Sequence, residues 1–169
     1  MHPLDRAHLI LTTERLKPAS TFRGHDNIEK ILKKTTLYYV LTKTHNGFVC
    51  DATYDENIYE QFVKMRNRSV QENKIEAEEW KIKADHEYFG SIYGYPECCI
   101  EAYTTNMRNG IGIKRLKELD NVPQKLYCLF HIPCSSNCVE SLELAKRYRL
   151  VLEKTDQEAV VALEKFNKS

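Results

Sequence analysis

The chain has 169 residues, which suggests a single domain, and its 25 Lys and Arg residues balance 24 Asp and Glu residues to a net charge of +1. This near-neutral balance argues against a protein held to nucleic acid or anionic lipid by its overall field. No apolar run approaches the roughly 18 to 20 residues of a membrane span, and the N-terminus lacks the pattern of an export signal. We therefore expect a soluble, cytoplasmic protein that does not enter a membrane.

Two short helices are predicted near the N-terminus. The apolar residues of segment 5–17 favour a helix that ends before Pro18, although residues 8–12 would also suit a strand. Segment 26–34 carries apolar residues on one helical face and predicts a second short helix.

A β-hairpin is predicted next. Strand-forming residues lie on both sides of Asn46-Gly47, a pair typical of a two-residue hairpin turn because both positions favour positive φ. We expect the hairpin to cover residues 37–53. Because an isolated hairpin is only marginally stable, it needs a further partner, and residues 125–130 are the candidate third strand.

The rest of the chain is predicted to be helical. Helices are expected over residues 55–80, 96–107, 114–119 and 136–166. Gly90 and Gly94 are expected to break the chain before Pro96, which suits the first position of a helix.

Capping residues divide the last helical segment in two. Ser135 or Ser136 can cap the first helix, and Thr155 with Glu158 has the spacing of a capping box for the second. The expected fold class is therefore mainly α (α+β): a single compact helical domain, residues 1–169, with a small β-hairpin or three-stranded sheet.

The six cysteines carry the strongest chemical signal. In a chain without an export signal, clustered thiols beside a histidine point to metal binding or redox chemistry rather than to a disulfide framework. Cys50 and Cys128 lie in apolar segments and are expected in the core. The candidate metal ligands are the remaining four cysteines and the nearby histidine: Cys98, Cys99, His131, Cys134 and Cys138.

Predicted helix starts explain why these thiols suit a metal. Cys98 and Cys99 follow Pro96 in a first turn. With Ser135 or Ser136 as the cap of the next long helix, Cys134 would lie just outside that helix and Cys138 in its first turn. The unpaired N–H groups and positive dipole end of a helix lower a thiol pKa and favour the thiolate, which is the form that binds metal. Zinc takes Cys₄ or Cys₃His sets, and iron–sulfur clusters take thiolates, so either zinc or an iron–sulfur cluster is the expected cofactor.

The two cysteine motifs resemble those of a known family. The run G-Y-P-E-C-C at 94–99, followed by H-x-P-C-S-x-x-C at 131–138, resembles an uncharacterised domain family, found mainly in archaea, with G-[FY]-P-x-C-C and H-x-P-C-S-x-x-C motifs. The resemblance covers residues 88–148, within the C-terminal half (about 88–150) that carries the motifs. It implies that the five candidate ligands form a site shared by the family, and it implies no reaction.

Two other functions remain open alternatives. A metal-free thiol redox protein would use Cys134 with Cys138, or Cys98, and His86 could partner a cysteine nucleophile. A nucleic-acid-binding module would use basic clusters at Lys33-Lys34, Arg66–Arg68, Lys114–Lys117 and Lys146–Arg149. Acidic residues interspersed with these clusters favour solvated helix faces over nucleic-acid binding. Whether the thiol site is catalytic is not determined by the sequence.

Overall fold

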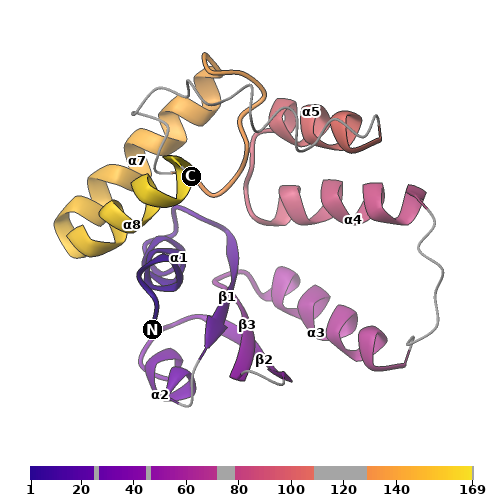
Figure 1. Cartoon of the computed structure of the whole chain (residues 1–169). Helices are drawn as coiled ribbons and strands as arrows, with labels where there is room; N and C mark the ends of the chain where they lie inside the picture. Colours follow the sequence, from indigo (N-terminus) through magenta and orange to yellow (C-terminus); the bar gives the residue numbers. More distant parts are fainter. Residues whose placement is uncertain (25–26, 45–46, 72–78, 109–128, 169) are drawn as a thin grey trace. The chain divides into compact units, whose positions relative to one another are not determined.

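The computed structural model describes residues 1–24, 27–44, 47–71, 79–108 and 129–168 (Figure 1). It divides the chain into two compact units, Met1–Glu76 and Ala77–Ser169. Helices predominate in the described residues and one small antiparallel sheet accompanies them, so the predicted α+β class is confirmed. The organisation of the whole chain as a single domain stays a prediction.

The first unit combines three helices with the sheet. Its elements are α1 (Pro3–Thr13), β1 (Ala19–Gly24), α2 (Ile28–Leu32), β2 (Tyr38–Thr44), β3 (Gly47–Thr53) and α3 (Glu56–Gln71). The strand order is β1-β3-β2, and both pairings are antiparallel. Helix α1 packs on β1, and α3 packs on β2 and β3. The predicted hairpin is confirmed as β2 and β3, but its predicted turn pair was wrong: Gly47 is the first residue of β3 and lies opposite Thr44, while Asn46 lies outside the described residues.

The third strand of the described sheet is β1 rather than the predicted segment 125–130. Leu129 and Phe130 lie in irregular structure, and the residues before them are outside the described part of the chain. Strand β1 contains Ala, Ser and Gly, which have low β propensity, and it was therefore not recognised from composition. Small residues are required there: a Cβ on Gly24 would lie 2.7 Å from a side-chain atom of Ile28.

The core of this unit lies between the sheet and its helices. A cluster of buried residues forms it: Leu9, Phe22, Ile28, Leu32, Leu37, Cys50 and Ala52. Cys50 is fully buried, which confirms its predicted core position, and Cys128 lies outside the described residues. Burial raises the pKa of the Cys50 thiol to about 12, with a further contribution from Asp51, so this cysteine is an inert packing group.

A buried ion pair ties the central strand to α3. The Asp51 side chain is fully buried and accepts hydrogen bonds from Arg66 Nε at 2.6 Å and Nη2 at 3.0 Å, and from Thr21 Oγ1 at 2.6 Å. Removing one partner of such a pair leaves the other groups desolvated without compensation.

We expect Asp51→Ala to lower the free energy of unfolding by about 3 kcal/mol, measured by chemical denaturation. The control is Glu60→Ala on α3, which removes the exposed pair of Glu60 with Lys64 (3.7 Å) and should cost less than about 1 kcal/mol. Equal losses in the two variants would contradict a structural role for the buried pair.

The second unit is helical throughout its described elements. These are α4 (Glu79–Ile92), α5 (Glu97–Arg108), α7 (Val139–Thr155) and α8 (Gln157–Lys168). Helix α4 packs against α5, and α7 packs against α8 (Figure 1). The helix predicted over 55–80 corresponds to α3 and the first residues of α4, with 72–78 outside the described residues. The helix predicted over 114–119 also lies outside them.

Only one of the two predicted glycine breaks ends a helix. Gly94 has φ +71°, its N–H bonds to Ser91 O at 3.0 Å, and the N–H of Tyr95 bonds to Gly90 O at 2.9 Å. This pair of bonds is the Schellman motif that terminates α4. Gly90 lies inside α4 instead, where a Cβ would lie 2.7 Å from the Ile100 side chain, so it permits close packing of α5.

Other predicted helix boundaries also differ from the structure. Helix α1 ends at Thr13, because Arg15 adopts φ +58° and the N–H groups of Leu16 and Lys17 turn back to Leu11 O. Helix α7 begins at Val139 with Cys138 as its N-cap, rather than at a serine cap.

The cap of α8 is likewise Asp156, one residue after the predicted Thr155. Asp156 Oδ1 accepts the N–H of Ala159 at 3.0 Å, whereas the Thr155 hydroxyl donates back to Val151 O within α7. Within the described residues, no helix combines the length and the apolar character needed to cross a lipid bilayer.

Candidate metal centre

Two of the candidate thiols lie at the start of α5. Pro96 has no N–H, and its carbonyl accepts the N–H groups of Cys99 at 2.9 Å and Ile100 at 3.0 Å, which begins the helix. Cys98 and Cys99 therefore occupy the first turn, as predicted, although the helix begins at Glu97 rather than at Pro96. Cys98 is exposed and Cys99 is buried.

The other two thiols lie on the loop before α7 and at its N-cap. Cys138 closes a turn through its N–H to Ser135 O at 3.2 Å, and its carbonyl accepts the first helical bond from Leu142 at 3.0 Å. Cys134 lies earlier in the same loop and its backbone N–H donates to Cys99 Sγ at 3.2 Å. The loop is thus held directly against the first turn of α5.

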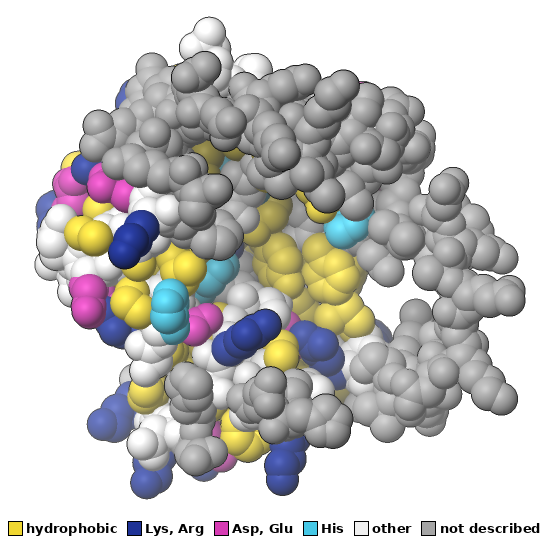
Figure 2. All heavy atoms as spheres, viewed as in Figure 1, with side chains coloured by type: hydrophobic (Ala, Val, Ile, Leu, Met, Phe, Trp, Pro, Cys, Tyr) yellow, Lys and Arg dark blue, Asp and Glu magenta, His cyan; other side chains and the backbone are white. Residues whose placement is uncertain are grey.

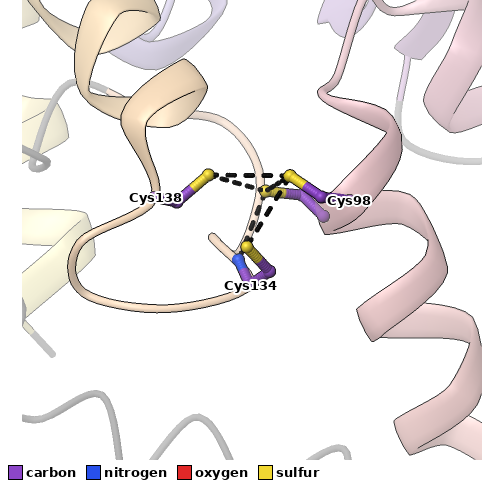
Figure 3. A group of neighbouring side chains, drawn as sticks. Cys98, Cys134 and Cys138 are labelled. Atoms are coloured by element: carbon purple, nitrogen blue, oxygen red, sulfur yellow. Dashed lines mark hydrogen bonds between the residues drawn. The ribbon is translucent and has the colours of Figure 1, made fainter.

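The four sulfurs converge on one point between these elements (Figure 3). Cys98 Sγ lies 3.9 Å from Cys99 Sγ and 3.7 Å from the sulfurs of both Cys134 and Cys138. Cys99 Sγ lies 3.6 Å from Cys138 Sγ, and all four sulfurs lie within 4.8 Å of one another. Sulfurs in a tetrahedral site with Zn–S bonds near 2.3 Å are about 3.5 to 4 Å apart. The arrangement could hold one tetrahedral ion.

His131 lies beside this group and contacts it through Ser141. The set of ligand atoms within 4.8 Å comprises the four sulfurs and does not include the imidazole. His131 Nε2 lies 2.9 Å from Ser141 Oγ, which lies 3.2 Å from Cys99 Sγ. Direct ligation by His131 stays a prediction. In the structure the Ser141 hydroxyl lies between its ring and the Cys99 thiol.

Ser141 is a site residue that sequence reasoning missed. It is fully buried at the third position of α7, and its hydroxyl joins the imidazole to the thiol cluster. Its position three residues after Cys138 was the available signal, because the N-cap and N3 residues of a helix face each other.

Tyr95, which immediately precedes Pro96 and α5, is a second site residue that sequence reasoning missed. It contacts the loop before α7. Its hydroxyl donates to Phe130 O at 3.1 Å, and its ring lies 4.9 Å from the ring of His131, centre to centre. Burial raises the pKa of Tyr95 far above its ordinary value, so the hydroxyl stays a donor at physiological pH. Gly94 allows this placement by ending α4 immediately before it.

Protonation differs among the clustered thiols. Lowered pKa values were predicted for the thiols at the start of α5, and this was wrong: desolvation, followed by contacts with the Cys134 and Cys138 thiols, raises the pKa of Cys98. Desolvation also raises the pKa of Cys99, to about 11, although Ser141 and the Cys134 N–H oppose it. For Cys138, desolvation is outweighed by the Ser141 hydroxyl and amide and by the neighbouring thiols, and the pKa is lowered to about 7. Of these three thiols, Cys138 is therefore the first to ionise.

His86, the proposed partner of a cysteine nucleophile, lies on α4. Its ring packs edge-on against Tyr103 of α5, with 5.2 Å between ring centres. The Lys114–Lys117 cluster lies outside the described residues, so its prediction stays untested.

Comparison with known proteins identifies the family. Residues 58–167 match the model of a protein family of unknown function, DUF483. The chain belongs to this family. The match includes most of α3 and all four cysteines of the thiol cluster, and the expected membership of an uncharacterised, archaeal-like family is confirmed.

Two archaeal proteins are similar to parts of this DUF483 member. An uncharacterised protein of Methanothermobacter thermautotrophicus is 33% identical over 88 residues, covering 44% of this chain and 49% of the relative. The uncharacterised protein MJ1106 of Methanocaldococcus jannaschii is 29% identical over 85 residues, covering 45% of each chain. The chain thus spans less than half the length of these relatives. No solved structure matches it significantly.

Proposed function

We propose that this DUF483 member is a cytoplasmic zinc-binding protein in which Cys98, Cys99, Cys134 and Cys138 hold one structural zinc ion. The observation that carries the proposal is the close approach of the four sulfurs: four of their six separations are 3.6 to 3.9 Å, and all lie within 4.8 Å. Four protein ligands complete a tetrahedral shell, and closed shells of this kind are structural. The ion would join the start of α5 to the loop before α7.

The sulfur spacing favours a single ion over an iron–sulfur cluster. A cluster distributes its thiolates over two or more irons, so its ligand sulfurs must lie farther apart than those around one atom. All four sulfurs here lie within 4.8 Å of one another. Zinc is preferred among single ions because a closed thiolate tetrahedron is its common structural site.

The surroundings of the sulfurs also suit a bound ion. The Cys134 N–H and the Ser141 hydroxyl both approach Cys99 Sγ, and hydrogen bonds of this kind orient ligands and stabilise thiolate charge. In the proposed site His131 positions Ser141 rather than ligating the metal. None of the five described cysteines forms a disulfide, which is compatible with the proposed zinc site in a reducing cytoplasm.

The metal-free redox alternative is less well supported by the geometry. A redox dithiol requires one pair of sulfurs, whereas Cys98 Sγ has three sulfur neighbours at 3.7 to 3.9 Å. This pattern is typical of one vertex of a tetrahedron.

The nucleic-acid alternative is not favoured by the described charges. Figure 2 shows basic side chains interspersed with acidic and uncharged ones on the visible face. Three described members of the basic clusters are paired with glutamates: Lys33 with Glu29, Lys146 with Glu143, and Arg149 with Glu153. A continuous basic surface would be needed for binding through phosphates.

Metal analysis of protein purified without oxygen tests the proposal. We expect one zinc per chain by elemental analysis, and a visible spectrum typical of a tetrahedral thiolate site after substitution with Co²⁺. His131→Gln should retain one zinc, because the imidazole acts through Ser141. A metal-free protein with thiols that cycle reversibly would contradict the proposal, as would an iron- and sulfide-containing chromophore. Loss of zinc from His131→Gln would instead make the histidine a ligand.

A further inference from the structure

A cavity of about 320 Å³ opens beside the thiol cluster in the second unit. Its walls come from α4, α5 and the loop before α7, and Cys99 and His131 form part of the lining. Five aromatic residues dominate the rest: Phe89, Tyr93, Tyr95, Tyr103 and Phe130. The proposed zinc role does not use this cavity.

The aromatic rings are held in fixed positions by one another. Phe89 and Tyr93 stack with 5.8 Å between ring centres, and Tyr93 lies 5.8 Å from Tyr95. Tyr95 in turn lies 4.9 Å from His131, which belongs to the loop. Rings that are already ordered present stacking surfaces to a ligand at a low entropic cost.

The chemistry of the walls restricts the ligand. The described lining contains no Lys or Arg, and zinc with four thiolates beside it would carry a net negative charge, so an anionic ligand would be desolvated there without a counter-charge. The imidazoles of His86 and His131 and the tyrosine hydroxyls provide hydrogen-bonding groups among the apolar faces. The cavity therefore suits a neutral molecule with an apolar face and a polar edge.

The volume sets the size of that molecule. A dry cavity of about 150 Å³ in another protein accommodates benzene, so about 320 Å³ leaves room for a two-ring system. We infer that this cavity is a binding site for an uncharged, planar heteroaromatic molecule of about two rings, stacked between the tyrosines of α4 and α5 and the loop. The inference rests on the proposed function in one respect: the zinc would hold the wall formed by His131.

Calorimetric titration of the full-length, zinc-loaded protein with indole and with adenine tests the inference. We expect saturable binding of at least one of these probes at one site per chain. Cyclohexanol, which lacks a planar face, and benzoate, which carries a negative charge, should not bind. Tyr93→Leu and Tyr103→Leu should each weaken binding about tenfold, which corresponds to about 1.4 kcal/mol. The matched control is Tyr38→Leu, because Tyr38 is exposed on β2 and outside the lining, and the affinity of this variant for the probe should stay within twofold.

A third lining substitution tests the cavity without changing a tyrosine. Ile132→Phe enlarges a lining side chain on the loop and should abolish binding while one zinc per chain is retained. Absence of saturable binding to zinc-loaded protein would overturn the inference and leave the zinc proposal intact. Binding that tolerates all three lining substitutions would overturn it as well. Failure of the zinc proposal would be recognised separately, by metal analysis before any probe is added.

Discussion

Cys99→Ser is expected to raise the dissociation constant for zinc by at least about 100-fold and to destabilise the second unit. Cys99 is the buried member of the α5 pair, and its sulfur also receives the Cys134 N–H and contacts the Ser141 hydroxyl. Structural zinc contributes about 10 to 16 kcal/mol in small peptides, and even a quarter of that would be a large share of a domain's stability. We expect a fall in the melting temperature of about 10 °C or more, measured by differential scanning calorimetry alongside zinc content.

Cys50→Ser is the matched control for this result. Cys50 is equally buried but lies in β3 of the first unit, outside the thiol cluster. Its substitution should destabilise the protein by about 1 to 3 kcal/mol through an unfavourable buried hydroxyl, while one zinc per chain is retained. A Cys99→Ser protein that holds zinc as tightly as the wild type would exclude a four-thiolate site.

The second large effect is expected from Lys17, which is fully buried in the first unit. Its Nζ lies 3.5 Å from His8 Nδ1, and burial lowers its pKa from 10.5 to about 7. Between these pH values the unfolded chain binds a proton that the folded chain does not, so the Lys17 contribution to stability rises with pH across this window. Below about pH 7 the full cost of burying the charge is present.

Substituting this lysine by methionine should remove that cost and its pH dependence. We expect Lys17→Met to be more stable than the wild type by up to about 4 kcal/mol at pH 6.5, with the advantage shrinking steadily by pH 9.5. Urea denaturation of both proteins at several pH values measures the difference. Lys30→Met is the control, because it makes the same substitution at an exposed lysine on α2. A constant difference between Lys17→Met and wild type would show that Lys17 titrates normally in the folded state.

Local sequence patterns predicted the elements whose signals are contained within a few residues. The hairpin was recognised because strand formers flank a turn pair, and α5 because Pro96 precedes a helical run. Strand β1 was missed for two reasons. Its pairing with β3 joins residues about 30 positions apart, and its small residues are required by close packing although their β propensity is low. The caps Cys138 and Asp156 were placed one to three residues too early because neighbouring serine and threonine residues are equally good caps in isolation.

In the candidate site, too, some residues were predicted from the sequence and others were not. The cysteine motifs identified all four thiols, because thiols beside helix starts are recognisable from spacing alone. The sequence could not rank His131 among the ligands, and it could not identify Ser141 or Tyr95 as supports. Their roles depend on which side chains of α5, α7 and the loop approach one another, and this is set by packing.

By itself, the sequence determined that the chain is mainly helical, that one hairpin accompanies the helices, and that its chemistry is concentrated in two short cysteine motifs. Only the tertiary structure decided that both adjacent cysteines turn their sulfurs toward Cys134 and Cys138, that the histidine meets them through a serine, and that an aromatic cavity adjoins them. The physical reason is that residue spacing specifies the direction of a side chain within one element. Distances between elements depend on long-range packing, which no local pattern encodes.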